Sequence, residues 1–155
     1  MKYLWRLLDS MRVTLAWLPI IWRDRQWDYV FLLKILRHKL LLMQRFYGNE
    51  RRAQLENAQQ NALEIQRVIE VVDRLIADEY LGAELEPHEA RWGVSVINPD
   101  YRGESVLMFP LATKAEQAQA LAEFRAACKV SDVTRQLDWV KLWRYLNDKA
   151  QGWWD

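Results

Sequence analysis

The chain contains one cysteine, five glycines and four prolines among its 155 residues. The lone Cys128 excludes an intramolecular disulfide, and the scarcity of glycine and proline favours long helices over a turn-rich all-β fold. The sequence also lacks a glycine-rich phosphate loop and the Cys/His spacing of a metal site. Its two histidines, His38 and His88, lie far apart in the sequence. We therefore predict no catalytic residues, no metal and no cofactor, and a protein that is not an enzyme.

Long apolar runs are also absent. The apolar stretch Val13 to Trp22 is too short to span a bilayer, and charged residues precede it. Apolar residues make up 51% of the chain and charged residues 28%, which is typical of a globular protein. A chain of this length buries roughly two thirds of its unfolded surface and needs no disulfide or metal for a core. We expect a single domain, residues 1–155, in the cytoplasm and without membrane contact, with an amphipathic helix that lies on a membrane surface as the alternative.

Three segments carry apolar residues at helical spacing. The first covers residues 3–18 and should kink or end near Leu18, because Pro19 follows. The second runs from about Trp27 to Tyr47 and is apolar around much of its circumference, so we expect it to be the most buried helix. The third runs from about Ala53 to Glu79 and has one clear apolar face. A short loop between the second and third segments predicts an antiparallel hairpin.

Residues 81–112 differ from the rest, because they hold three of the four prolines and three of the five glycines. Residues 90–97 and 104–109 predict a small β-hairpin, with an irregular loop as the alternative. Two more helices should follow, at 114–127 and 132–150. The predicted fold class is mainly α: a helical bundle around a long antiparallel helical hairpin, with a small irregular or β-hairpin insertion.

The charges are unevenly spread along the chain. Residues 1–52 hold eleven Lys/Arg and four Asp/Glu, a net +7, whereas residues 53–104 hold four and eleven, a net −7. One interpretation is internal pairing, in which a basic first part packs against the acidic third helix. The other is an anion-binding surface on the first third of the chain.

Tryptophan is unusually common, with nine residues. Several lie beside a cation, as in Trp22-Arg23 and Arg25-Gln26-Trp27. Tryptophan supplies a flat stacking surface, and arginine stacks on rings and forms paired hydrogen bonds with phosphates or carboxylates. Core filling is the alternative for any single tryptophan, but we expect at least two of them to line a pocket or an interface. So much aromatic surface also predicts a homo-oligomer.

Three features predict structural roles or a buried charge. Lys39 lies on the apolar stripe of the second helix and should be at least partly buried, beside a ligand anion or an acid such as Asp73. Asp28 lies in the first turn of that helix, where the helix dipole favours a carboxylate. The chain ends in Trp153, Trp154 and Asp155, a tail that should dock on the body or on another subunit.

A set of short sequence motifs is spread along the chain from residue 27 to its end. It consists of Trp27-Asp28-Tyr29, Leu32-Leu33, Lys39-Leu40, Met43, Phe46-Tyr47, Val72-Asp73-Arg74 and Trp153-Trp154-Asp155. In this order the chain resembles a family of small, uncharacterised phage-encoded helical proteins. The resemblance implies a phage origin and the cytoplasm of an infected bacterial host. It does not extend to the first 21 residues or to residues 81–112.

Three hypotheses for the function remain. The first is a phage counter-defence protein that sequesters a small anionic, nucleotide-type immune signal. The second is an inhibitor that binds a host or defence protein through a Trp-rich surface. The third is a nucleic-acid binder, which the net charge of +1 disfavours.

For the first hypothesis the ligand-binding candidates cluster at the entry to the second helix. They are Arg23, Arg25, Trp27, Tyr29 and Lys39, completed by Arg45, Arg51 or Arg52 of another subunit. The alternative is that these cations only pair with the acidic third helix.

Overall fold

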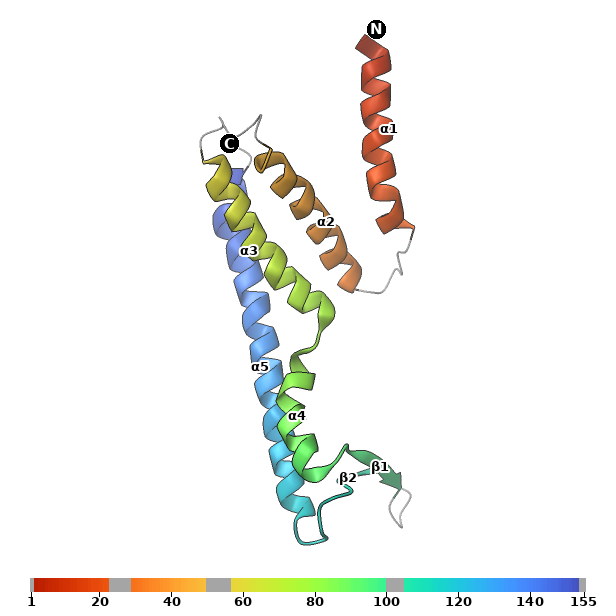
Figure 1. The fold of residues 1–155 in the computed structure, drawn as a ribbon, viewed down its shortest axis with the longest axis vertical. Coiled ribbons are helices and arrows are strands. Elements are labelled where there is room, and N and C mark those ends of the chain that lie inside the picture. Colours follow the sequence, from red (N-terminus) through yellow and green to blue (C-terminus); the bar gives the residue numbers. More distant parts are fainter. Residues whose placement is uncertain (1, 23–28, 50–56, 100–104, 154–155) are drawn as a thin grey trace. The chain divides into compact units, whose positions relative to one another are not determined.

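The computed structural model describes residues 2–22, 29–49, 57–99 and 105–153. Within these ranges the chain is mainly α-helical, with five α-helices, one short 3-10 helix and a two-stranded antiparallel sheet (Figure 1). The predicted fold class is confirmed. The chain divides into two compact units, Met1–Ile76 and Ala77–Asp155. The single-domain assignment stays a prediction.

The first helix, α1 (Lys2–Ile21), continues through Pro19 instead of ending at Leu18. Proline has no N–H to donate to the carbonyl of Leu15, but the ladder resumes beyond it, and the Trp22 N–H donates to the Leu18 carbonyl at 2.9 Å. Only the last turn of the helix lies beyond the proline. The missing hydrogen bond therefore does not end the helix.

Helices α2 (Tyr29–Tyr47) and α3 (Ala58–Ala77) form the predicted antiparallel hairpin. Arg37 of α2 contacts Asp73 of α3, and Gln44, seven residues further along α2, contacts Gln66, seven residues back along α3. The two helices therefore run in opposite directions, as Figure 1 also shows.

The ends of this hairpin follow the sequence where they are described. Gly48 ends α2, and its N–H donates to the Gln44 carbonyl at 2.8 Å, as predicted for a helix stop. Helix α3 ends before Asp78, whose φ of 50° lies in the left-handed region. The predicted starts of the two helices, at Trp27 and Ala53, lie outside the described residues.

The most buried helix of the first unit is α3 and not α2, which corrects the prediction. The buried residues of α2 are Leu33, Leu40 and Met43. Those of α3 are Ala58, Ile65, Val68, Ile69, Val71, Val72 and Leu75. The apolar residues of α2 spread around the helix and leave some outside, such as Leu32, whereas those of α3 lie mostly on one broad face, with Leu63 outside it.

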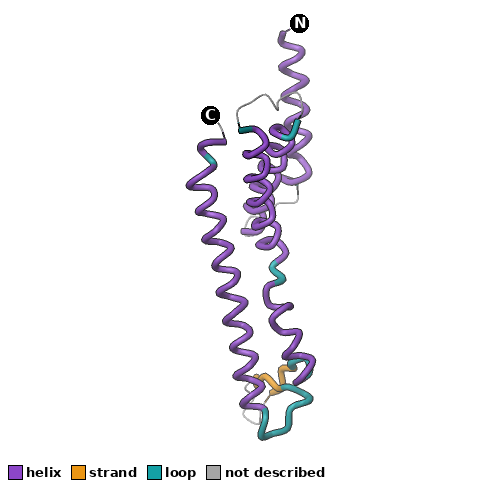
Figure 2. The backbone as a smooth tube through the Cα atoms, turned by 60° about the vertical axis from the view of Figure 1, so that its left-hand side comes forward, coloured by secondary structure: helices purple, strands orange, loops and turns teal. Residues whose placement is uncertain are grey.

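The second unit begins with α4 (Tyr80–Trp92), so the prediction of an irregular segment is wrong for residues 81–92. Leu85, His88 and Trp92 recur at three- and four-residue spacing and are all at least partly buried. Helix α4 lies along α5 (Gln117–Lys149), as Figure 2 shows. Pro87 is accommodated inside the helix, because burial of the neighbouring face outweighs the loss of one backbone hydrogen bond.

A β-hairpin is present, as predicted, but its first strand begins at Val96 and not at residue 90. Strands β1 (Val96–Pro99) and β2 (Ser105–Met108) pair antiparallel, with Val96 opposite Met108. Gly93 joins α4 to this hairpin with a φ of 78°, and a Cβ there would come within 3.2 Å of the Leu111 side chain. Both constraints favour glycine at this position.

The two predicted C-terminal helices are one continuous helix, α5 (Gln117–Lys149), followed by the 3-10 turn η2 (Gln151–Trp153). No glycine or proline lies between Pro110 and Gly152, so nothing in the sequence breaks the backbone. Asp132 was predicted to open a new helix, but its carboxylate accepts a hydrogen bond from Arg135 one turn later, at 2.7 Å.

The core of the second unit lies between α4, β2 and the first turns of α5. Trp92, Phe109 and Ala120 are buried there, and Leu107, Leu121 and Phe124 pack around them. At the start of α5, the side-chain amide of Gln117 donates hydrogen bonds to the backbone carbonyls of Phe109 (2.8 Å) and Ala112 (2.9 Å). These bonds hold the segment between β2 and α5 in place.

The side chain of Glu123 makes the stability of this core depend on pH. The hydrogen bond from Trp92 Nε1, at 2.6 Å, is the main cause that lowers the pKa of Glu123, and a hydrogen bond from Gln119 adds to it. A carboxyl whose pKa is lowered by folding stabilises the protein above its ordinary pKa, near 4.5, and the contribution is lost as the pH falls through the lower folded value.

We therefore expect Glu123→Gln to flatten the acid limb of the stability curve. Melting temperatures measured from about pH 6 down to about pH 3 should fall less steeply for this variant than for the wild type. Glu86→Gln, at an exposed glutamate of α4, is the matched control and should follow the wild-type curve. Parallel curves for Glu123→Gln and the wild type would contradict the assignment.

The terminal tail is structural where it is described. Trp153 is only 3% exposed, as predicted, whereas Trp154 and Asp155 lie outside the described residues. Trp153→Ala should lower the free energy of unfolding by about 3–5 kcal/mol, because the removed ring leaves a cavity. Trp143→Ala, at an exposed tryptophan of α5, should cost much less. Equal denaturation midpoints for the two variants would exclude a structural tail.

Candidate functional site

Most of the predicted ligand-binding residues lie outside the described residues. These are Arg23, Arg25, Trp27, Arg51 and Arg52, together with the predicted structural residue Asp28. Tyr29 and Arg45 are described, and both are exposed on α2. They are sixteen residues apart on one helix, about 24 Å at 1.5 Å per residue, so one chain does not bring them to one small ligand.

Lys39 does not occupy the predicted position. It is exposed on α2, and Asp73, its predicted partner, pairs with Arg37 instead. The prediction of a partly buried lysine is wrong because the stripe of α2 was drawn too wide. The residues of α2 that are buried are Leu33, Leu40 and Met43, and Lys39 lies beside this set.

The pairing of Arg37 with Asp73 bears on the charge asymmetry. The hydrogen bond to Asp73 raises the pKa of Arg37, so the guanidinium stays charged. Both side chains are about 40% exposed, at 42% and 44%, so solvent screens the pair. At this place a basic residue of the first third does pair with the acidic third helix, as the internal-pairing interpretation requires.

Arg37 also lines a pocket between α1 and α2, here called the α1–α2 pocket, with a volume of about 390 Å³. Its lining residues are Pro19 and Ile20 of α1 and Phe31, Lys34, Arg37, His38 and Leu41 of α2. The lining combines an apolar wall, a phenyl ring, an imidazole ring and two cations. On α2 it belongs to the first four turns, close in sequence to the predicted entry site. This volume is in the range of small-molecule sites.

His38 is the unusual residue of this pocket. Its ring lies edge-on against Trp17, with centroids 4.7 Å apart. Its Nε2 atom is buried and has no hydrogen-bond partner among the described residues. Its sequence neighbours Arg37 and Lys39 favour a solvated position on the helix, but Trp17 of α1 covers the ring and the side chain is partly buried. Buried polar atoms are nearly always hydrogen-bonded, so a missing partner needs an explanation.

His88 in the second unit shows the ordinary arrangement. It is also buried and lies edge-on against Phe109, but its Nε2 is 2.9 Å from the Ala120 carbonyl oxygen. The two histidines therefore have similar aromatic surroundings and differ in the hydrogen bond.

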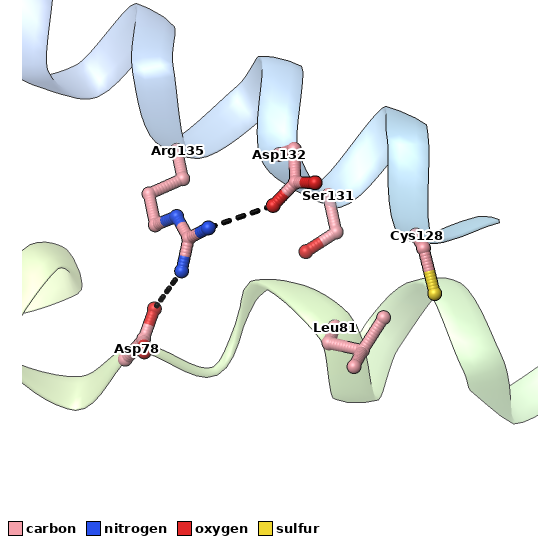
Figure 3. A pocket seen from close by; sticks show the side chains of 6 residues that line it. All are labelled: Asp78, Leu81, Cys128, Ser131, Asp132 and Arg135. Atoms are coloured by element: carbon pink, nitrogen blue, oxygen red, sulfur yellow. Dashed lines mark hydrogen bonds and ion pairs between the residues drawn. The ribbon is translucent and has the colours of Figure 1, made fainter. Parts of the chain in front are cut away.

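A second pocket, of about 380 Å³, lies in the second unit (Figure 3). Its lining residues are Asp78, Leu81, Cys128, Ser131, Asp132 and Arg135. Arg135 bridges Asp132 and Asp78, at 2.7 and 3.6 Å. The cation is thus shared between two carboxylates of its own pocket, which leaves little positive charge for an external anion.

The tryptophans divide between core and surface. Seven of the nine lie in the described residues, and of these Trp92 and Trp153 are buried. Trp5, Trp22 and Trp143 are exposed at 73%, 83% and 61%. Core filling therefore explains part of the set and leaves large rings on the surface.

Two functional classes find no support in the described residues. Within them, no three His, Cys, Asp or Glu side chains are grouped so as to hold a metal ion. None of the helices in those ranges has the length and apolarity to cross a bilayer. Comparison with protein-family models, curated proteins and solved structures gave no match to this chain.

The two histidines provide a test of the unpaired nitrogen. His38→Phe keeps a ring against Trp17 and removes a buried atom without a partner, so it should raise the free energy of unfolding by about 1 kcal/mol. His88→Phe is the matched control, because it removes a hydrogen-bonded nitrogen and leaves the Ala120 carbonyl without that partner. It should lower the free energy of unfolding by about 1–3 kcal/mol. Urea denaturation measures both changes. A destabilised His38→Phe would mean that Nε2 is satisfied in solution.

Proposed function

We propose that this protein binds and sequesters a small anionic ligand of nucleotide type in the α1–α2 pocket. The observation that carries the proposal is the buried, unpartnered Nε2 of His38 in a pocket that also holds Lys34 and Arg37. A ligand that hydrogen-bonds to this atom would satisfy it and would at the same time place its negative charge beside two cations.

The cations suit a phosphate in different ways. Lys34 is exposed and supplies a point charge on a flexible stem. Arg37 is held by Asp73, which neutralises part of its charge but also limits the conformational freedom that its guanidinium loses when a ligand arrives. Phosphate groups form strong charge-assisted hydrogen bonds with both side chains.

The apolar wall suits the rest of a nucleotide. Phe31 offers an aromatic face, and stacking of a base on such a ring stabilises binding by roughly 1–3 kcal/mol. Ile20 and Leu41 add apolar surface. A free phosphate would use the cations and leave this wall wet. A phosphate carried on an aromatic base uses both parts.

The biological setting is part of the proposal. The resemblance to phage-encoded proteins suggests that the ligand is an immune signal of an infected bacterium, held away from its receptor in the host cytoplasm. Sequestration requires binding without chemistry, which agrees with a sequence that carries no catalytic motif. Arg23 and Arg25 extend the proposed site in sequence, and Arg45, Arg51 or Arg52 of a second subunit complete it.

A second candidate is the inhibition of a host or defence protein through a Trp-rich surface. The exposed rings of Trp5, Trp22 and Trp143 favour it, because tryptophan is enriched among the residues that dominate protein interfaces. Nucleic-acid binding is the weaker third candidate, because the net charge is only +1.

Calorimetric titration with cyclic nucleotides, cyclic dinucleotides and ADP-ribose tests the first proposal. At least one nucleotide should bind, and it should bind more tightly than inorganic phosphate or adenosine alone. Lys34→Glu should weaken that binding about 10- to 100-fold, since a hydrogen bond to a charged group is worth roughly 1.5–3 kcal/mol. His38→Phe should also weaken it.

Lys129→Glu is the matched control, because it makes the same charge change at an exposed lysine outside the pocket lining. Its affinity should equal that of the wild type. If no nucleotide binds to the folded protein, sequestration is excluded. If nucleotide binding survives Lys34→Glu and His38→Phe but is lost in Arg23→Glu with Arg25→Glu, the ligand lies at the entry to α2 instead.

A further inference from the structure

Helix α1 carries a second apolar surface that neither the pocket nor the core explains. Trp17 and Ile20 are half-buried and belong to the side of α1 that contacts α2 or lines the pocket. On the other side, Leu8, Met11, Leu15, Leu18 and Trp22 form what is called here the α1 stripe. These five side chains are 44–83% exposed. An apolar surface of this size on a water-soluble chain marks a contact site.

The spacing of the α1 stripe identifies the kind of contact. Its members follow one another at intervals of three, four, three and four residues, which is the a/d repeat of two helices packed in a coiled coil. No charged residue interrupts it: Arg6 and Arg12 lie off this line. The repeat therefore fits the side of another α-helix.

The charge pattern argues against a lipid surface. A helix that lies on a membrane has a strongly charged face opposite its apolar face. The face of α1 opposite the stripe carries Val13, Trp17 and Ile20 as well as Arg6, so it is mixed and not strongly charged. A helix with apolar residues on two opposite sides packs between two protein surfaces.

We infer that the α1 stripe pairs with the α1 stripe of a second copy of this chain, in antiparallel orientation. In that arrangement Leu15 meets its counterpart at the two-fold axis, Met11 meets Leu18, and Leu8 meets Trp22. A medium-sized side chain then faces the largest one, so that the pair fills space evenly. A parallel pair would place the two bulky Trp22 rings at one level.

The antiparallel orientation also sets the two helix dipoles in opposite directions. The five side chains, with Leu7 and Ile21 beside them, offer on the order of several hundred Å² per copy, which is comparable with the roughly 800 Å² per partner of a stable interface.

Sedimentation equilibrium of the full chain tests the inference. The wild type should have the mass of two chains at micromolar concentration. Leu15→Glu places a charge at the centre of the stripe and should shift the mass to one chain, with an unchanged helical circular-dichroism spectrum. Ala16→Glu, the neighbouring exposed residue off the stripe, is the matched control and should remain dimeric.

Cross-linking tests the orientation in a Cys128→Ser background. A mixture of Leu8→Cys and Trp22→Cys chains should form a mixed disulfide, and Leu8→Cys alone should form none. A monomeric wild type, a dimer that persists in Leu15→Glu, or efficient self-cross-linking of Leu8→Cys would each overturn the inference. A monomer that binds anionic vesicles through the stripe would overturn it in favour of a membrane surface. Nucleotide affinity is measured separately, so loss of the dimer and loss of ligand binding are distinguishable.

Discussion

The contact between Arg37 and Asp73 links the fold of the first unit to its pocket. Asp73 comes from α3, whose apolar face is the most regular in the unit, and Arg37 lies on the α2 surface that lines the α1–α2 pocket. The pair, with Gln44 and Gln66 further along, aligns the two helices of the hairpin. As an energetic contribution it is small, because both partners are partly exposed. Its consequence is positional, since it holds a cation at the pocket wall.

The two histidines show why local sequence did not reveal this pocket. His38 has Arg37 and Lys39 as neighbours, which favours a solvated position, and nothing nearby in sequence indicates that Trp17 covers its ring. That contact joins residues on two helices, and periodicity within one helix does not describe it. His88 lies in a segment whose Pro87 and Gly82 directed the prediction towards an irregular chain. Its burial depends on α5, where Ala120 lies 32 residues further along the chain.

Other parts of the fold could be predicted because their signals are local. The α2–α3 hairpin follows from apolar spacing and from Gly48, and the two strands follow from β-branched residues around turn-forming ones. The failures share one cause. The sequence predicted a kink or an end of the helix at Pro19, an irregular segment around Pro87 and the start of a new helix at Asp132, and in each case one helix continues through the position. A proline inside a helix costs roughly 3 kcal/mol or more. Burial of the neighbouring face outweighs this cost at Pro87, whereas at Pro19 only the last turn of the helix follows.

Helix α1 carries apolar residues on two of its faces, and each face needs a surface to pack against. A helix that packs on one side only needs polar residues on the other, and α1 has few, with Ser10 and Thr14 among them and Thr14 donating to the Ser10 carbonyl. Its Trp17 side covers His38 and closes one wall of the pocket. Pro19 and Ile20 line the pocket. Leu18, which lies between Trp17 and Pro19 in the sequence, belongs to the exposed α1 stripe. Whatever holds the stripe therefore also fixes the rotation of α1, and with it the face that α1 presents to the ligand pocket.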